Sequence, residues 1–270
     1  MIELLQLPFM QRAIIAGAVL GVVLAYLGVF VTLRKMAFFS DGIAHAALAG
    51  AAIGLLTRFS PLLSALIFSM VLAGLIYWLE KKSNLPSDSI IGILFTSGMA
   101  LGIILISLRR GYQPELLAYL FGNILAIRRQ DLALIALLSL LIMGFILTQK
   151  RKLTLLTLDR EMAYMAGVNP DLYQLLLYIM LAAALVMGIR VLGVILVSAI
   201  LIIPVSSARL LSRSFKTLVW WTVGISEGVM IGGLLISYYL NLPSGAVIVL
   251  TGSTVFALAF AASGFFRKRR

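Results

Sequence analysis

The sequence predicts an all-α, polytopic integral membrane bundle of about eight or nine helices. Of the 270 residues, 62% are hydrophobic and only 12% are charged, whereas soluble domains carry about 25% charged residues. The mean hydropathy is +1.09. A membrane span needs about 20 mostly apolar residues, and a helix satisfies its own backbone hydrogen bonds in lipid. Candidate spans occupy 13–33, 37–57, 61–79, 89–108, 131–148, 171–188, 190–208, 217–238 and 245–265.

The first candidate span, 13–33, is expected to be a permanent helix. It is too long for a removable signal peptide, and it lacks the basic start and the small-residue cleavage site of such peptides. No stretch of the sequence has the composition of a soluble domain. We therefore predict a single transmembrane domain over 1–270.

Basic residues predict that the amino terminus lies outside the cell and the carboxyl terminus in the cytoplasm. Most of the 22 Lys and Arg residues lie in alternate loops, and basic loops remain cytoplasmic. These loops hold Arg34 and Lys35, Lys81 and Lys82, Lys150 to Lys152, the 209–216 segment, and 267–270. The net charge of +12 therefore marks the topology of a multi-pass protein in contact with membrane lipid, and no nucleic acid partner is predicted.

The second candidate span carries the only histidine of the chain, in the stretch SDGIAHAALAG at 40–50. Asp41 and His45 are four residues apart, so a helix places both side chains on one face. Counted inward from Arg34 and Lys35, they lie about 10 Å and about 15 Å deep. A carboxylate with a neutral imidazole suits zinc and also accepts manganese or iron(II). A structural hydrogen bond between helices and a proton relay are the alternatives.

Two connections are longer than the others. The first, 109–130, contains PELLAYLFGNILAI, for which we expect a short interfacial or re-entrant helix. In the second, 149–170, Thr157 or Asp159 caps a short cytoplasmic helix that ends at Gly167. This helix fits either a docking surface for another protein or an ordinary connecting helix on the inner interface. It carries Glu161, Met162, Tyr164 and Met165.

Two later spans contain residues that are unusual in lipid. Pro204 lies within 190–208, where its missing N–H and its ring kink or break a helix. The nearby Ser198, Ser206 and Ser207 can bond freed carbonyl groups or line a polar path. Glu227 lies centrally in 217–238. It either faces the same ion pathway as the Asp41 and His45 pair or bonds a serine or carbonyl group on a packed helix.

No motif in the sequence indicates an enzyme. There is no G-x-x-x-x-G-K-[ST] loop, no H-E-x-x-H pair and no second histidine, and no nucleophile elbow of a serine hydrolase is found. Because cysteine is absent, neither disulfides nor thiolate metal ligands are available. We predict a protein that is not an enzyme and holds no tightly bound cofactor.

Six blocks of the sequence occur in the order seen in the permease subunits of metal ABC importers. They read RKMAFFSDGIAHAALAGAAIGLL, SDSIIGILFTSGMALGIILIS, LAYLFGNILAI, LDREMAYMAGVNP, LGVILVSAILIIPVSSARLL and SYYLNLPSGAVIVL. Along essentially its whole length, the chain resembles the zinc/manganese/iron ABC permease family. It looks most like the zinc-uptake branch of that family.

The resemblance implies a homodimer of permeases in a prokaryotic plasma or inner membrane. It also implies an ABC ATPase subunit and an extracytoplasmic solute-binding protein as partners. The coupling helix to the ATPase maps to about 157–168, with Asp159, Glu161, Met162, Tyr164, Met165 and Gly167. The intramembrane metal site maps to Asp41 and His45. Glu227 lies outside the matched blocks and stays a candidate ligand that is particular to this sequence.

The predicted function is therefore ATP-driven import of a divalent metal ion, with zinc as the cargo. Manganese or iron(II) import by the same family is one alternative. A stand-alone carrier, in which Asp41 and His45 relay protons, is the alternative from another class. The importer hypotheses require ATP and a partner ATPase for transport, whereas the carrier hypothesis requires neither.

Overall fold

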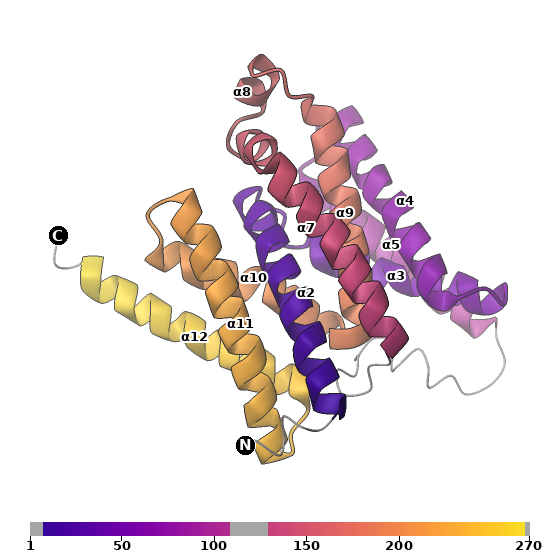
Figure 1. Ribbon diagram of the computed structural model, residues 1–270. Coiled ribbons are helices and arrows are strands. Elements are labelled where there is room, and N and C mark those ends of the chain that lie inside the picture. Colours follow the sequence, from indigo (N-terminus) through magenta and orange to yellow (C-terminus); the bar gives the residue numbers. More distant parts are fainter. Residues whose placement is uncertain (1–7, 109–128, 268–270) are drawn as a thin grey trace. The chain divides into compact units, whose positions relative to one another are not determined.

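The fold is entirely helical in the part of the chain that the structure describes. The structure is a computed structural model that describes residues 8–108 and 129–267 (Figure 1). Nine helices in these residues are long and apolar enough to cross a membrane, and no strand occurs among them. The predicted all-α, polytopic class is confirmed. The short helix expected within 109–130 lies outside the described residues.

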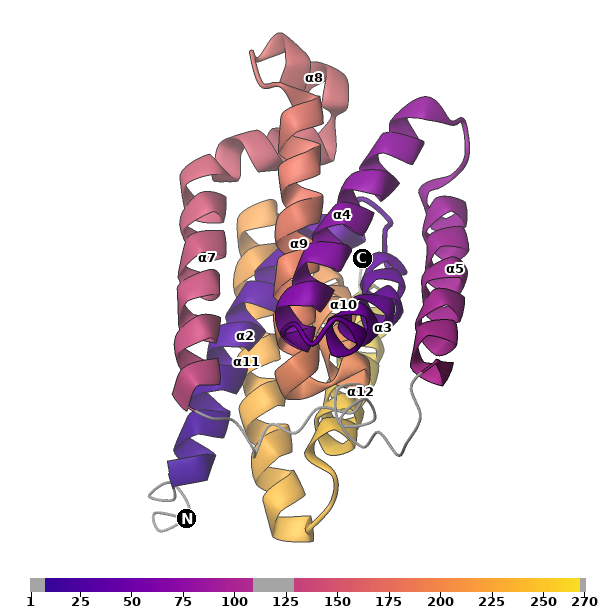
Figure 2. The ribbon, with the colours of Figure 1, turned by 90° about the vertical axis from the view of Figure 1, so that its right-hand side faces the viewer.

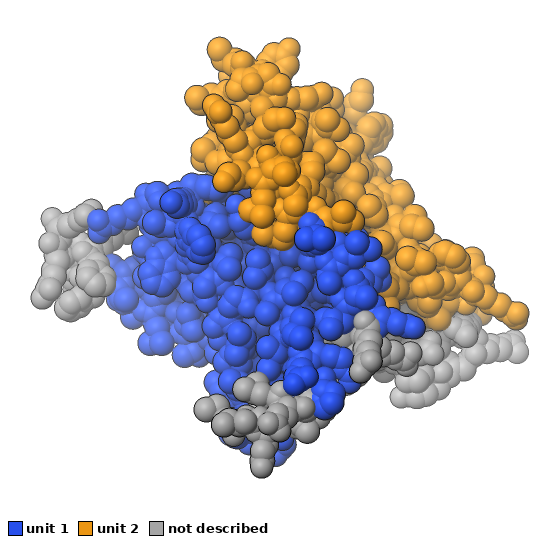
Figure 3. Space-filling model, viewed as in Figure 1, with its two compact units in different colours: residues 1–32, 121–140, 191–270 blue, residues 33–120, 141–190 orange. Residues whose placement is uncertain are grey.

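The described residues form two compact units (Figure 3). Unit 1 contains 8–32, 129–140 and 191–267, and unit 2 contains 33–108 and 141–190. Helix α7 (Arg129–Leu158) contributes to both units. The prediction of a single domain over 1–270 remains a prediction.

Unit 1 is built from α2 (Pro8–Leu33), α10 (Val194–Leu211), α11 (Phe215–Leu240) and α12 (Ser244–Arg267). Helices α10, α11 and α12 pack against one another. Helix α2 approaches α11 closely, because the Ser226 hydroxyl donates to the Gly21 carbonyl oxygen at 3.1 Å. The ends of α11 follow local rules: Ser214 and Thr217 form a capping box, and Asn241 ends the helix in the left-handed conformation.

Unit 2 contains α3 (Phe39–Leu56), α4 (Pro61–Lys82), α5 (Ser87–Ser107), α8 (Arg160–Met165) and α9 (Pro170–Leu192). Helix α3 packs against both α4 and α5. Glycine allows this close approach, since a Cβ atom at Gly98 of α5 would lie 2.7 Å from the Cβ of Ala46. Both views show α8 between the ends of α7 and α9 (Figures 1 and 2).

Several helix boundaries differ from the sequence-based expectation, and those of α7, α10 and α3 matter most for the candidate site. Helix α7 continues past residue 148 to Leu158, so the basic stretch 150–152 is helical. Helix α10 continues through Pro204 to Leu211, so the proline does not break it. Helix α3 begins only at Phe39, after a turn at 34–38. The depths of about 10 Å and about 15 Å assumed a helix rising directly from Arg34 and Lys35, and this assumption is wrong.

Candidate functional site

Asp41 and His45 form the one accessible stripe in the first part of α3. Along 39–52, every residue is buried except these two, which are half-buried. Their spacing places both side chains on one face of the helix, as the sequence predicted. A carboxylate and an imidazole are therefore presented together on an otherwise buried, apolar helix.

The His45 ring is held in one tautomer by its own helix. Its Nδ1 atom lies 2.9 Å from the Asp41 carbonyl oxygen. A carbonyl oxygen can only accept a hydrogen bond, so Nδ1 carries the proton. In the neutral ring this leaves the lone pair on Nε2, the nitrogen that is then available to bind a metal ion.

Two further features define this site. The Phe95 ring of α5 meets the His45 ring edge-on, with centroids 5.0 Å apart and planes at 84°. Asp41 lies in the first turn of α3, where the positive end of the helix dipole stabilises a carboxylate. The dipole thus offsets part of the cost of placing a carboxylate in an apolar span.

Glu227 occupies a separate environment in α11 of unit 1. Its Oε1 atom is buried and accepts no hydrogen bond from the described residues. A Cβ atom at Gly21 of α2 would lie 2.6 Å from this oxygen, so any larger residue there would require the Glu227 carboxylate to shift. The neighbouring serine, Ser226, bonds the Gly21 carbonyl group rather than the carboxylate.

The predicted short helix is present as α8, and Asp159 is its cap. The Asp159 carboxylate accepts from the backbone N–H groups of Glu161 and Met162 at 2.8 and 3.0 Å. Thr157 does not cap it, because its hydroxyl donates to the Leu153 carbonyl oxygen within α7. Beyond the helix, Gly167 has a φ of 74°, which glycine adopts without strain.

Helix α8 presents apolar side chains to the surroundings. Met162, Tyr164 and Met165 are 60, 73 and 87% exposed, respectively. The opposite side of the helix is anchored, since Ala163 packs with Leu156 and Val168. Large exposed apolar groups on an anchored helix are typical of a surface that binds another protein.

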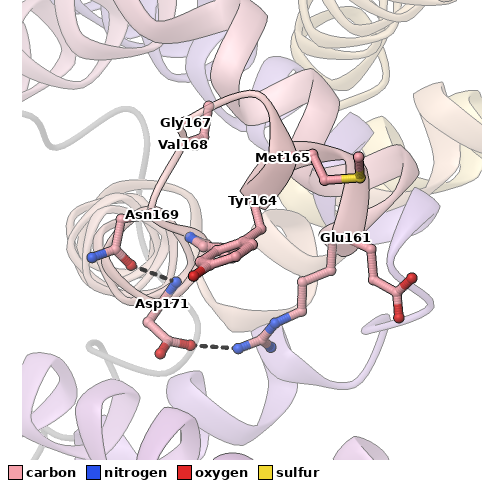
Figure 4. Close-up of a pocket in the computed structure, with 9 residues that line it drawn as sticks. Glu161, Tyr164, Met165, Gly167, Val168, Asn169 and Asp171 are labelled. Atoms are coloured by element: carbon pink, nitrogen blue, oxygen red, sulfur yellow. Dashed lines mark hydrogen bonds and ion pairs between the residues drawn. The ribbon is translucent and has the colours of Figure 1, made fainter.

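A groove of about 1210 Å³ runs beside α8 and the first turn of α9 (Figure 4). Asn169 caps α9 by accepting from the Asp171 N–H at 3.1 Å. The Asp171 carboxylate forms an ion pair with Arg160, marked in Figure 4, and another with Lys81 at 2.5 Å. Helices α4, α8 and α9 are therefore joined at this end of unit 2.

Pro204 and the serines on either side of it lie within α10 and differ from one another in burial. Pro204 is buried and Ser206 is half-buried. The Ser207 hydroxyl donates to the Ile203 carbonyl oxygen at 2.9 Å, an ordinary bond within the helix. A polar path along Ser198 and Ser206 remains a prediction.

Comparison with known proteins identifies the family. The ABC 3 transport family matches residues 6–263. The chain belongs to the ABC 3 transport family. Members of this family are permease subunits and not enzymes themselves, and this ABC 3 permease is a multi-pass protein of the cell membrane.

Relatives of this ABC 3 permease are named for two different metals. The manganese transport system membrane protein MntC of Halalkalibacterium halodurans is 35% identical over 258 residues, covering 96% of this chain and 88% of MntC. The high-affinity zinc uptake system membrane protein ZnuB of Haemophilus influenzae is 31% identical over 247 residues, covering 92% and 95%. The manganese-named relative is thus as close as the zinc-named one.

A solved structure supports the fold of this ABC 3 permease over nearly its whole length. PsaBC from Streptococcus pneumoniae, solved in complex with Fab, superposes with a TM-score of 0.84 at 32% identity. The match covers 96% of this chain and 94% of that one. The helical architecture described above is therefore also that of a solved protein.

The structure places the predicted ligands of this ABC 3 permease in two groups. Asp41 and His45 lie together in unit 2, whereas Glu227 lies in unit 1. No group of three or more His, Asp or Glu side chains gathers in the described part of either unit. Sequence reasoning missed Phe95 as a neighbour of His45, because a phenylalanine in an apolar span gives no signal of such a contact.

Proposed function

We propose that this chain is the permease subunit through which a divalent metal ion enters the cell, driven by ATP hydrolysis on a partner ATPase. Membership of the ABC 3 family and the names of its relatives support the class. The observation that carries the proposal is the accessible pair of Asp41 and His45 on an otherwise buried stretch of α3.

The proposed ion site uses the Asp41 carboxylate and His45 Nε2. Both are ligands that zinc and manganese accept. Two protein ligands leave most of the coordination shell to water, which suits a site that must release its ion. Glu227, in unit 1, is kept as a separate candidate ligand for the ion, since its buried Oε1 accepts no hydrogen bond from the described residues.

The proposed coupling surface is α8 with its flanks, 157–168. Its exposed Met162, Tyr164 and Met165 would contact the ATPase subunit. Asp159 and Gly167 would stabilise the two ends of the helix. A solute-binding protein would deliver the ion from outside, and a second copy of the permease would complete the transporter as a homodimer. Ser198, Pro204 and Ser206 are retained as candidate pathway residues.

The cargo is proposed to be zinc, with manganese as the direct competitor and iron(II) as a further alternative. Carboxylate and imidazole together match the borderline character of zinc. The same pair accepts manganese, and relatives named for manganese are equally similar. The cargo must therefore be decided by transport measurements.

The deciding experiment is metal uptake into proteoliposomes that contain the permease, its ATPase and its binding protein. Radiolabelled zinc, manganese and iron(II) are tested separately, each with and without ATP. Wild type is compared with His45→Ala, and Thr57→Ala at the end of α3 serves as the matched control. We expect ATP-dependent uptake that falls at least about tenfold in His45→Ala and is unchanged in Thr57→Ala.

Two results would contradict this proposal. Normal uptake by His45→Ala in an intact complex would remove His45 from the ion path. Uptake by the permease alone, driven by a pH gradient and indifferent to ATP, would instead indicate a proton-coupled carrier.

A further inference from the structure

A buried polar cluster in unit 2 centres on the hydroxyl group of Tyr178. Tyr178 is 2% exposed, and its hydroxyl donates to Glu80 Oε2 at 2.7 Å. Gln174, 6% exposed, donates to the same carboxylate oxygen at 3.1 Å and to the Tyr178 hydroxyl at 3.2 Å. The sulfur atom of Met36 lies 3.1 Å from that hydroxyl. We call Met36, Glu80, Gln174 and Tyr178 the Tyr178 cluster.

The Tyr178 cluster is bonded directly to α8. The remaining polar atom of the Gln174 side chain, Oε1, accepts from Arg160 Nη1 at 3.1 Å. Arg160 is the first residue of α8, and it also pairs with Asp171. The same guanidinium group thus ties the short helix to the buried amide and to the start of α9.

The Tyr178 cluster also contacts the start of α3. The Tyr178 and Phe39 rings pack with centroids 5.1 Å apart, and Phe39 is the first residue of α3 and fully buried. Met36 belongs to the turn that leads into this helix. Asp41 and His45 follow within the next two turns, so a displacement of Phe39 carries them with it.

Two buried polar atoms at or beside the Tyr178 cluster have no hydrogen-bond partner among the described residues. They are Glu80 Oε1 and Arg34 Nη1, and the Arg34 guanidinium lies 5.8 Å from the centre of the Tyr178 ring. An unmatched buried donor and an unmatched buried acceptor are both costly. A second arrangement that satisfies them would be favoured once an outside force shifts the helices.

We propose that the Tyr178 cluster couples α8 to α3, so that a movement imposed on α8 by the ATPase reaches Asp41 and His45. The proposal rests on the function proposed above. Gln174, Glu80 and Tyr178 act as positioning residues, because they do not touch the ion. Packed, hydrogen-bonded side chains with two discrete arrangements are the physical means by which such coupling is carried.

The test is the number of metal ions imported per ATP hydrolysed by the reconstituted complex. Tyr178→Phe removes the hydroxyl and keeps the ring, and Tyr239→Phe, at an exposed tyrosine of α11, is the control. We expect Tyr178→Phe to continue to hydrolyse ATP while the ratio falls about fivefold. Tyr239→Phe should keep the wild-type ratio. A ratio within about twofold of wild type in Tyr178→Phe would overturn the proposal.

A second variant covers the case in which Tyr178→Phe does not assemble. Arg160→Ala removes the bond to Gln174 together with the ion pair to Asp171, at an exposed position. Lys152→Ala, which loses an exposed hydrogen bond and a cation–π contact to Tyr173 and no contact to Gln174, is its control. A lower ratio of imported ions to hydrolysed ATP in Arg160→Ala, with a wild-type ratio in Lys152→Ala, supports the coupling. An unchanged ratio in Arg160→Ala overturns the proposal. If the wild-type complex shows no ATP-driven uptake of zinc or manganese, the proposed function itself fails and this inference fails with it.

Discussion

At the scale of single residues, the tautomer of His45 decides which ring nitrogen can bind an ion. The bond from Nδ1 to the Asp41 carbonyl oxygen assigns this role to Nε2. A glutamine side chain reaches about as far as Nε2, whereas an asparagine side chain ends near Nδ1. These two substitutions therefore separate the ligand role from the hydrogen bond within the helix.

We expect His45→Gln to retain more ATP-dependent metal uptake than His45→Asn. The glutamine keeps an oxygen ligand near the ion, while the asparagine keeps only the donor to the Asp41 carbonyl group. The difference should be about tenfold, which is typical when a metal site loses a ligand or its support. Initial uptake rates at subsaturating metal measure it, and equal rates for both variants would show that Nε2 does not bind the ion.

At the scale of helices, α8 depends on its cap and on its neighbours. It has only six residues, and isolated helices of this length are not stable in water. The bonds from Asp159 to two backbone N–H groups and the cluster of Leu156, Ala163 and Val168 therefore hold its shape. Loss of either should disorder the proposed docking surface while the membrane-spanning helices remain intact.

We predict that Asp159→Ala weakens the association of the permease with its ATPase. Losing an N-cap costs about 1 kcal/mol, and serine is an equally good cap, so Asp159→Ser should behave as wild type. Thr148→Ala is the control, because Thr148 lies outside 157–168 and its hydroxyl donates to the Gly144 carbonyl oxygen within α7. Co-purification of the ATPase and hydrogen exchange of 160–165 measure the effect. Normal association of Asp159→Ala with faster exchange at 160–165 would exclude α8 as the docking surface.

The sequence could predict the helices because the bilayer sets their length and composition. All nine candidate spans correspond to helices in the described residues. The cap residue Asp159 and the glycine Gly167 correctly indicated where α8 begins and ends. Hydropathy could not place the end of α7, because a helix can extend past the lipid into water. The late start of α3 at Phe39 was likewise not evident, since 34–38 has no proline or glycine to mark a turn.

The site was only partly predictable. The spacing of Asp41 and His45 put them on one face, but the tautomer of His45 depends on a bond seen only in the structure. The Tyr178 cluster depends on how α4, α8 and α9 meet. Nothing in the sequence indicates which partner a buried Gln174 or Tyr178 will find.

At the scale of the whole molecule, the orientation in the membrane is the remaining prediction from the basic loops. The amino terminus is expected outside and the carboxyl terminus in the cytoplasm. This orientation puts α8 on the cytoplasmic side, where an ATPase subunit would meet it. It puts the turn between α11 and α12 on the outer side.

The absence of native cysteine allows a direct test of this orientation. Met165→Cys on α8 and Leu242→Cys in the turn after α11 both lie at exposed positions. In right-side-out membrane vesicles, a membrane-impermeant thiol reagent should label Leu242→Cys and should label Met165→Cys only after permeabilisation. The parent chain should not react. The opposite pattern would invert the topology.

The shortness of α8 has a practical consequence for inhibitors. A free peptide copied from 157–168 would lose the contact of Ala163 with Leu156, because Leu156 lies outside it. Such a peptide would be unfolded and a poor competitor for the ATPase. A useful mimic would have to include the end of α7 and the start of α9. Alternatively, a covalent cross-link within the peptide would have to stabilise the helix in their place.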